Sequence, residues 1–179
     1  MSVHTKDDTT KKKLNTLVVY YSLTNTTKTI AETIQKELSC DILRIKPKKS
    51  LNPNGNSKFV WGGMQATMHA KPKIESHNLD LSKYDLIFIG TPVWAWTFTP
   101  PIRTFLAEND LHNKNVALWT CAGGSDEKAL SRFKKQVKGC NLIDGMKIIQ
   151  PADNNPESNI KKTIEWVKSI KSGFIIKGV

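Results

Sequence analysis

Short, almost continuously apolar runs alternate with amphipathic helical patterns along most of this chain, and this alternation constrains the fold more than any other feature. Continuous apolar runs of four to eight residues are typical of strands buried on both faces of a sheet. Strands that alternate with helices predict an α/β fold around a parallel sheet. The five expected strands cover residues 16–21, 41–45, 85–90, 116–120 and about 146–149.

Apolar residues recur at helical spacing between these strands. Three such helical faces begin with Ile30, Ala129 and Ile160, and Pro101 suits the first turn of a fourth helix. A further helix is expected over about residues 57–69. These apolar faces are packing surfaces, so a ligand site is expected in the loops and not on the helices.

The length of the chain indicates one domain. With 179 residues, 39% of them apolar, it can bury a full core without disulfides or metals. We expect a flexible, basic tail over residues 1–14 and a single domain over residues 15–179. No apolar run approaches the roughly 20 residues that span a bilayer, so the expectation is a cytoplasmic protein without membrane insertion. The three cysteines form no C-x-x-C pair and the four histidines are scattered, so no metal site is expected.

The charge is strongly basic, with 27 Lys and Arg residues against 16 Asp and Glu and a net charge of +11. Such a charge attracts phosphates, anionic membranes or acidic proteins, and it does not indicate which of them is the partner. The basic residues are dispersed over the tail and several helices, and no nucleic-acid recognition motif accompanies them. Nucleic acid is therefore not an expected partner.

Hydroxyl-bearing residues crowd the turn after the first strand. Ser22, Thr24, Asn25, Thr26 and Thr27 precede a helix whose first backbone N–H groups have no intrahelical partner. Such a turn can hold a phosphate at the positive end of the helix dipole. The turn lacks the glycine and lysine pattern of a triphosphate loop and the G-x-G-x-x-G pattern of a dinucleotide fold, so a single monoester phosphate fits best. An ordinary helix N-cap is the alternative, because the same residue types are favoured there.

A second segment, residues 90–101, follows the strand at 85–90 and is expected to be a loop. Two tryptophans and a phenylalanine are costly to leave in water, and a flat aromatic ligand would cover them. The alternative is that these rings pack on neighbouring helices or on the second subunit of a homodimer. The candidate ligand-binding residues of this segment are Thr91, Pro92, Val93, Trp94, Ala95 and Trp96.

A third segment, after the strand at 116–120, consists of small residues: Cys121, Ala122, Gly123, Gly124 and Ser125. Small residues permit a ligand to approach the backbone closely, although a Gly-Gly turn before a helix is also common without one. Cys121 could be redox-active at such a place, or simply a small buried residue.

These three segments together resemble the flavodoxin family. The family's first loop is approximately [ST]-x-T-G-x-T, with Asn25 here in the glycine position. The stretches G-T-P-V-W at 90–94 and P-P-I-R-T-F-L at 100–106 resemble a subgroup of bacterial and archaeal flavodoxin-like proteins, as do W-G-G at 61–63 and K-P-K at 71–73. The likeness covers about residues 16–171.

The resemblance implies a doubly wound, five-stranded parallel sheet of order 2-1-3-4-5 with helices on both faces. It also implies FMN, with the phosphate on residues 22–27 and the isoalloxazine ring between the second and third segments. No catalytic side chain is expected, because the flavin itself carries the electrons.

Two departures from the family pattern leave two functions open. Flavodoxins that carry electrons are usually acidic and commonly stack a tyrosine from the third loop on the flavin, whereas this chain is basic and has only small residues there. Electron transfer to a redox partner protein with an acidic surface is the first expectation. An NAD(P)H-dependent quinone or flavin oxidoreductase is the alternative, with NAD(P)H and a quinone as its small-molecule partners.

Overall fold

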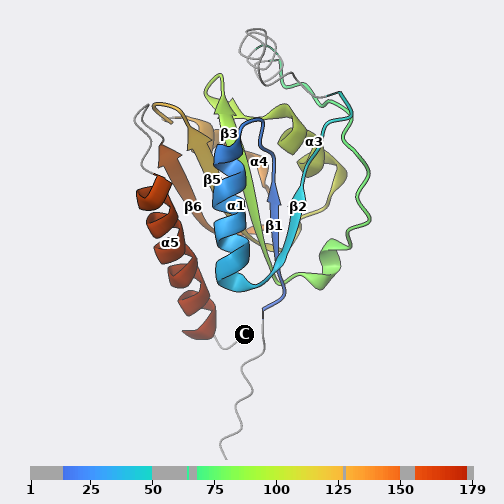
Figure 1. The fold of residues 1–179 in the computed structure, drawn as a ribbon. Coiled ribbons are helices and arrows are strands. Elements are labelled where there is room, and N and C mark those ends of the chain that lie inside the picture. Colours follow the sequence, from blue (N-terminus) through green and yellow to red (C-terminus); the bar gives the residue numbers. More distant parts are fainter. Residues whose placement is uncertain (1–13, 50–63, 65–67, 127, 150–155, 177–179) are drawn as a thin grey trace, which may run out of the picture.

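A computed structural model shows one central sheet with helices on both faces (Figure 1). The structure describes residues 14–49, 64, 68–126, 128–149 and 156–176. The tail expected over residues 1–14 lies outside this part of the chain except for its last residue. Most of the helix expected over about residues 57–69, including the W-G-G stretch at 61–63, lies outside it as well.

Five parallel strands form the sheet in the order β2-β1-β3-β5-β6, which confirms the predicted order 2-1-3-4-5. Buried apolar side chains cover both faces of the central strands, because helices lie on both sides. The strands are β1 (Thr16–Tyr20), β2 (Asp41–Arg44), β3 (Leu86–Trp94), β5 (Asn115–Ala122) and β6 (Asn141–Ile149).

Three strand boundaries differ from the prediction. β3 continues to Trp94, and a short strand, β4 (Thr97–Phe98), pairs back on it, so part of the predicted second loop is a β-hairpin. β5 likewise continues through Cys121 and Ala122. β6 begins at Asn141 and not near Met146, because this edge strand is mostly solvated and lacks the apolar run of a buried strand.

Helices α1 (Asn25–Leu38) and α5 (Pro156–Ile176) cover one face, and α3 (Pro100–Glu108) and α4 (Ala129–Gln136) cover the other (Figure 1). Prolines begin α3 and α5, where the missing backbone N–H costs no helical hydrogen bond. A single 3-10 turn, Leu81–Lys83, leads into β3. Within the described ranges, no helix is long and apolar enough to cross a membrane.

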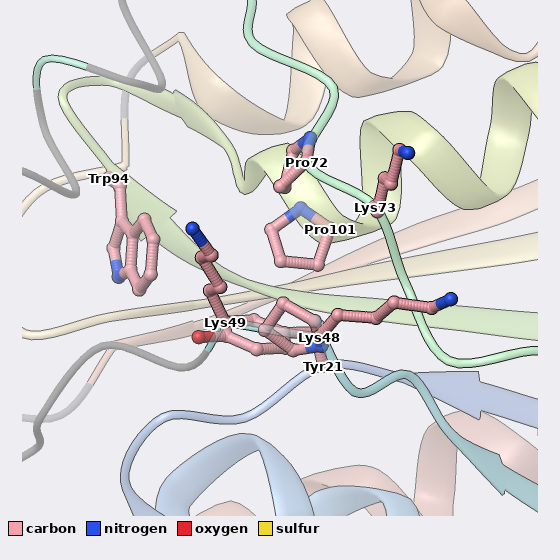
Figure 2. A pocket seen from close by; sticks show the side chains of 8 residues that line it. Tyr21, Lys48, Lys49, Pro72, Lys73, Trp94 and Pro101 are labelled. Atoms are coloured by element: carbon pink, nitrogen blue, oxygen red, sulfur yellow. The ribbon is translucent and has the colours of Figure 1, made fainter.

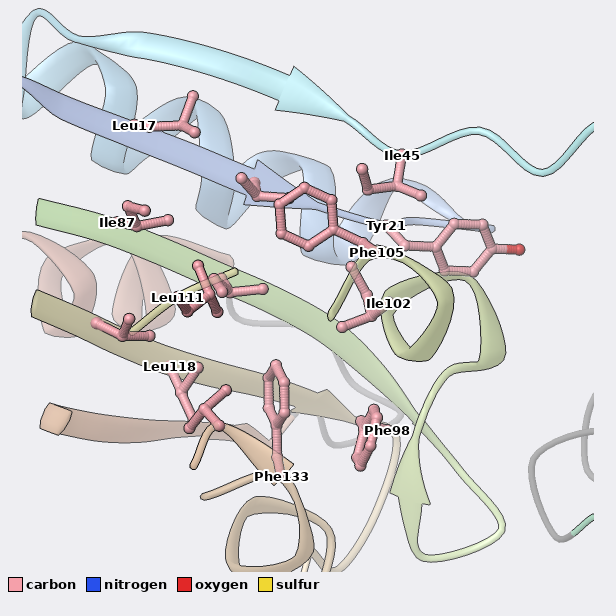
Figure 3. Packing of buried hydrophobic residues seen from close by; sticks show 14 of the residues in the cluster. Leu17, Tyr21, Ile45, Ile87, Phe98, Ile102, Phe105, Leu111, Leu118 and Phe133 are labelled. Carbon is pink, nitrogen blue, oxygen red and sulfur yellow. The ribbon is translucent and has the colours of Figure 1, made fainter. Parts of the chain in front are cut away.

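Two apolar clusters, one on each face of the sheet, hold these layers together. On the α3 and α4 side, Phe98 from the hairpin stacks on Phe133 of α4, with ring centroids 5.0 Å apart (Figure 3). On the α1 and α5 side, Trp119 is fully buried and lies directly against Gly90 of the neighbouring strand. The stacking of Phe98 therefore anchors the β3–β4 hairpin in the core, and the neighbouring C-terminal ends of the strands have a defined position.

Candidate functional site

The C-terminal ends of β1, β3 and β5 lie side by side at one edge of the sheet (Figure 1). The strand register places Tyr20 opposite Gly90 and Pro92 opposite Cys121. Parallel strands leave their C-terminal ends at a common edge, where ligands of open α/β sheets bind. The structure thus brings the three predicted segments together at that edge.

The first segment turns the chain from β1 into α1. Thr24 is the N-cap residue of α1, yet its side chain makes no capping hydrogen bond. The first turn of α1 carries no acidic residue that would offset the positive end of the helix dipole. Thr24 and Asn25 are both exposed. This helix end therefore presents backbone N–H groups, a hydroxyl and a carboxamide to an anion.

Other residues of the first segment interact with neighbouring groups of the protein. The Ser22 hydroxyl donates a hydrogen bond to the Thr24 carbonyl and so closes the turn. Thr27 is only 1% exposed, and its side chain lies beside the Cys121 thiol. Thr26 is half-buried. Ser22 and Thr27 thus shape the turn, whereas Thr24 and Asn25 face outward.

One cation beside this turn was missed by sequence reasoning. Arg44 ends β2, and its Nη2 donates a 3.0 Å hydrogen bond to the carbonyl of Ser22. In the sequence Arg44 is one of many dispersed basic residues, and only its place near the end of the strand predicted over residues 41–45 distinguished it. Its guanidinium adds positive charge next to the N-terminus of α1, which favours an anion there.

The second segment forms the hairpin of β3 and β4. Ala95 and Trp96 make its two-residue turn, with left-handed φ angles of 47° and 61°. Neither residue is a glycine or asparagine, so the turn is strained. The buried Thr91 hydroxyl hydrogen-bonds to Thr99, at 2.9 Å to Oγ1 and 3.0 Å from the backbone N–H. Thr91 thus ties the hairpin to the start of α3.

The two tryptophans of the hairpin have different surroundings. Trp94 is half-buried against Tyr21, whose ring it meets edge-on. Trp96 is 52% exposed at the tip, where its carbonyl accepts a 2.9 Å hydrogen bond from Nη1 of Arg132 in α4. The indole of Trp96 is therefore accessible to a ligand or a partner, on a strained turn that Arg132 anchors.

The third segment follows β5 as an exposed turn, and hydrogen bonds to Asp126 fix the C-terminal end of this turn. Gly123 and Gly124 are exposed, and a Cβ added to either would meet nothing within 4 Å. The buried Asp126 carboxylate accepts hydrogen bonds from the Thr120 hydroxyl and the backbone N–H of Ala129. The packing of the protein therefore does not require these glycines, and they leave the backbone accessible to a ligand.

Cys121 and Ala122 belong to β5 and are buried, so they lie beneath the surface of the site and are not exposed at it. Burial raises the pKa of the Cys121 thiol to about 12, against the opposing effect of the nearby Thr27 and Trp119 side chains. A thiol with this pKa stays protonated at neutral pH. This agrees with a packing role for Cys121 and not with a reactive thiolate.

A family model of flavodoxins matches residues 15–170, which is most of the chain. The chain belongs to the flavodoxin family. A flavoprotein of this fold from Lactobacillus acidophilus, crystallised in complex with FMN, is 25% identical, with a TM-score of 0.64 over 83% of this chain and 97% of that chain.

Two further structures of the flavodoxin fold are similar at lower identity. A protein from Bacteroides uniformis is 23% identical, with a TM-score of 0.73 over 88% of this chain and 99% of that chain. Oxidised flavodoxin 2 from Bacillus cereus is 18% identical, with a TM-score of 0.59 over 89% and 99%. No curated protein sequence matches the chain.

Proposed function

We propose that this flavodoxin-family protein binds FMN and transfers electrons through it to or from a partner protein. The observation that carries the proposal is the meeting of three features at one sheet edge. These are the uncapped N-terminus of α1 with Thr24, the aromatic hairpin of β3 and β4, and the open glycine turn after β5. The similar Lactobacillus acidophilus structure in complex with FMN supports this choice of flavin.

The phosphate of FMN would lie at the N-terminus of α1. Its negative charge would complement the helix dipole and the guanidinium of Arg44, and the Thr24 hydroxyl and Asn25 carboxamide are exposed beside it. No described ion pair involves Arg44, so its charge is not offset by a carboxylate of the described chain. These groups bind and orient the phosphate and take no part in chemistry.

The flavin ring would lie between the hairpin and the third segment. FMN, when bound, supplies the exchange of one or two electrons. The Trp94 and Trp96 side chains would shield the ring from water on one side, together with the neighbouring Pro92 and Val93. The backbone at Gly123 and Gly124 would border it on the other side.

A partner protein with an acidic surface would dock beside this site on α4. The exposed cations of this helix and its flanks have no described carboxylate partner, and Trp96 offers an exposed aromatic anchor next to them. Opposite charges steer transient redox complexes, and buried aromatic residues dominate interface energies. The cations are Lys128, Arg132, Lys135 and Lys138.

An NAD(P)H-dependent quinone or flavin oxidoreductase is the second candidate function. One observation favours it: Gly123, Gly124 and Ser125 are exposed, and no aromatic side chain of the third segment covers the flavin position. A nicotinamide or a quinone could approach the ring from that side. Stopped-flow spectroscopy separates the two functions, since rapid, saturable bleaching of the flavin by NADPH or NADH alone favours the oxidoreductase.

Titration with FMN tests the proposal. The protein should purify yellow, or gain thermal stability on addition of FMN and much less on addition of FAD. A ligand that binds only the native state raises its stability, by about 2.7 kcal/mol at a hundredfold excess over Kd. A colourless protein whose unfolding temperature does not respond to saturating FMN would contradict the proposed function.

A further inference from the structure

A cavity of about 430 Å³ opens beside Trp94, on the side where β1 and β2 end (Figure 2). No residue of the third segment lines it. Since β3 stands between β1 and β5 in the sheet, the cavity lies on the β1 side of the second segment, whereas the third segment lies on its β5 side. Its lining residues are Tyr21, Pro47, Lys48, Lys49, Pro72, Lys73, Trp94 and Pro101.

Backbone hydrogen bonds fix the walls of this cavity. The chain after β2 pairs with residues 73–74, through a bridge between Pro47 and Ile74 and a 2.8 Å hydrogen bond from the Lys48 N–H to the Lys73 carbonyl. The Thr104 hydroxyl of α3 donates a 2.8 Å hydrogen bond to the Pro72 carbonyl. The walls are thus preformed, which lowers the ordering cost of binding a ligand.

The surface of the cavity is largely apolar. Three prolines contribute rigid rings without backbone N–H donors, and Trp94 and Tyr21 contribute aromatic faces or edges. Tyr21 is only 3% exposed, and burial raises its pKa to about 12, so its hydroxyl stays neutral at physiological pH. Such walls suit a planar aromatic ring, and the volume suits a small molecule.

The rim of the cavity is positively charged. Lys48, Lys49 and Lys73 are exposed, and none of them forms an ion pair with a described carboxylate, whereas the neighbouring Lys46 pairs with Glu75 at 3.9 Å. In Figure 2 the Lys49 side chain extends between Trp94 and Pro101, and the other two lysines extend away from Trp94. Lys49 is therefore the cation best placed to meet an anionic group on a bound ring.

We propose that this cavity binds a small planar aromatic anion, with its ring against Trp94 and Tyr21 and its negative charge on Lys49. The site does not depend on FMN, because six of its eight lining residues lie outside the segments assigned to the flavin, and only Trp94 and Pro101 lie within them. Since Trp94 contacts both sites, an occupant of the cavity would lie next to a wall of the flavin site.

The test uses 2-naphthoate as the anionic probe and 2-naphthamide as its neutral counterpart. Each is titrated into the full-length protein, with saturating FMN and without it, while NMR shifts of the backbone amides and the tryptophan indoles are followed. We expect shifts at Tyr21, Lys48, Lys49 and Lys73 and at the indole of Trp94. The naphthoate should bind roughly fivefold more tightly than the naphthamide.

Lys49→Gln should remove this preference, lowering the affinity for naphthoate roughly fivefold and leaving that for naphthamide unchanged. Lys161→Gln, a matched loss of charge at an exposed position of α5, should change neither affinity. Competition between naphthoate and FMN, shifts centred on Gly123 and Gly124, an unchanged preference in Lys49→Gln, or no saturable binding would each overturn the proposal. Failure of FMN to bind would contradict the proposed function instead, since the titration without FMN still tests the cavity.

Discussion

The indole of Trp94 meets the ring of Tyr21 edge to face, with centroids 5.6 Å apart and planes at 88°. Tyr21 directly follows β1 and Trp94 ends β3, so this contact holds the hairpin against the end of the first strand. Both rings also line the lysine-rimmed cavity (Figure 2). Tyr21 and Trp94 therefore lie at the boundary between the proposed flavin site and that cavity.

Replacing Tyr21 should weaken the hairpin. Aromatic pairs of this geometry contribute about 0.5–1.5 kcal/mol beyond their buried area. We expect Tyr21→Leu to lower the free energy of unfolding by about 1–2 kcal/mol in urea titrations, and Tyr21→Phe, which keeps the ring, to lower it by less. A Tyr21→Leu protein as stable as the wild type would show that the contact contributes nothing measurable.

Thr24→Ala should weaken FMN binding about tenfold and leave riboflavin binding unchanged, because a hydrogen bond to a charged phosphate contributes about 1.5–3 kcal/mol. The same change should cost little stability, since the Thr24 side chain makes no capping hydrogen bond. Isothermal titration with both ligands measures the contrast. Thr29→Ala is the matched control, as its hydroxyl donates a hydrogen bond to the Asn25 carbonyl within α1. Equal losses for FMN and riboflavin would place the phosphate elsewhere.

Gly90→Ala and Gly123→Ala should behave oppositely. A Cβ at residue 90 would lie 1.9 Å from the ring of the fully buried Trp119, so the core must shift, and we expect a loss of about 3 kcal/mol or no folded protein. A Cβ at residue 123 meets nothing within 4 Å, so stability should change by less than about 0.5 kcal/mol. Gly123→Ala should nevertheless weaken FMN if the ring borders this turn. Urea unfolding and FMN titration of both variants provide the comparison.

Ala95→Gly should stabilise the apoprotein by about 1 kcal/mol, because the left-handed φ of 47° is strained for alanine and not for glycine. Ala107→Gly, at an exposed position in α3, is the opposite control and should destabilise by a similar amount. Both effects are measured by denaturant unfolding. A destabilised Ala95→Gly protein would mean that the turn has another conformation.

Stability should fall at alkaline pH through Cys121. Burial raises the pKa of this thiol to about 12 from 9.0, so the unfolded chain loses the proton first as the pH rises. The contribution is complete below pH 9 and declines by about 1.4 kcal/mol per pH unit towards pH 12. The stability difference between the wild type and Cys121→Ala should therefore shrink between about pH 9 and pH 11 in urea titrations. A constant difference over this range would show that the thiol ionises equally in both states.

The sequence by itself determined the layered architecture. Continuous apolar runs identified the central strands, helical spacing of residues such as Ile30 and Ile34 identified the buried helix faces, and Pro101 marked the first turn of α3. These signals are local, because burial on one face repeats with the period of the strand or helix that carries it. The predicted strands also indicated where a ligand would bind, because ligands of parallel sheets bind at the turns that follow the strands, here those after β1, β3 and β5.

Only the tertiary structure decided how the site is assembled. The β3–β4 hairpin turns at Ala95 and Trp96, without the glycine or asparagine that is typical of such turns. The packing of Phe98 and the hydrogen bonds between Thr91 and Thr99 hold this strained backbone in place. The contact of Arg44 with Ser22, and the cavity between Trp94 and Lys49, join segments far apart in the chain. Such neighbours depend on strand register and on long-range pairing, which no local periodicity encodes.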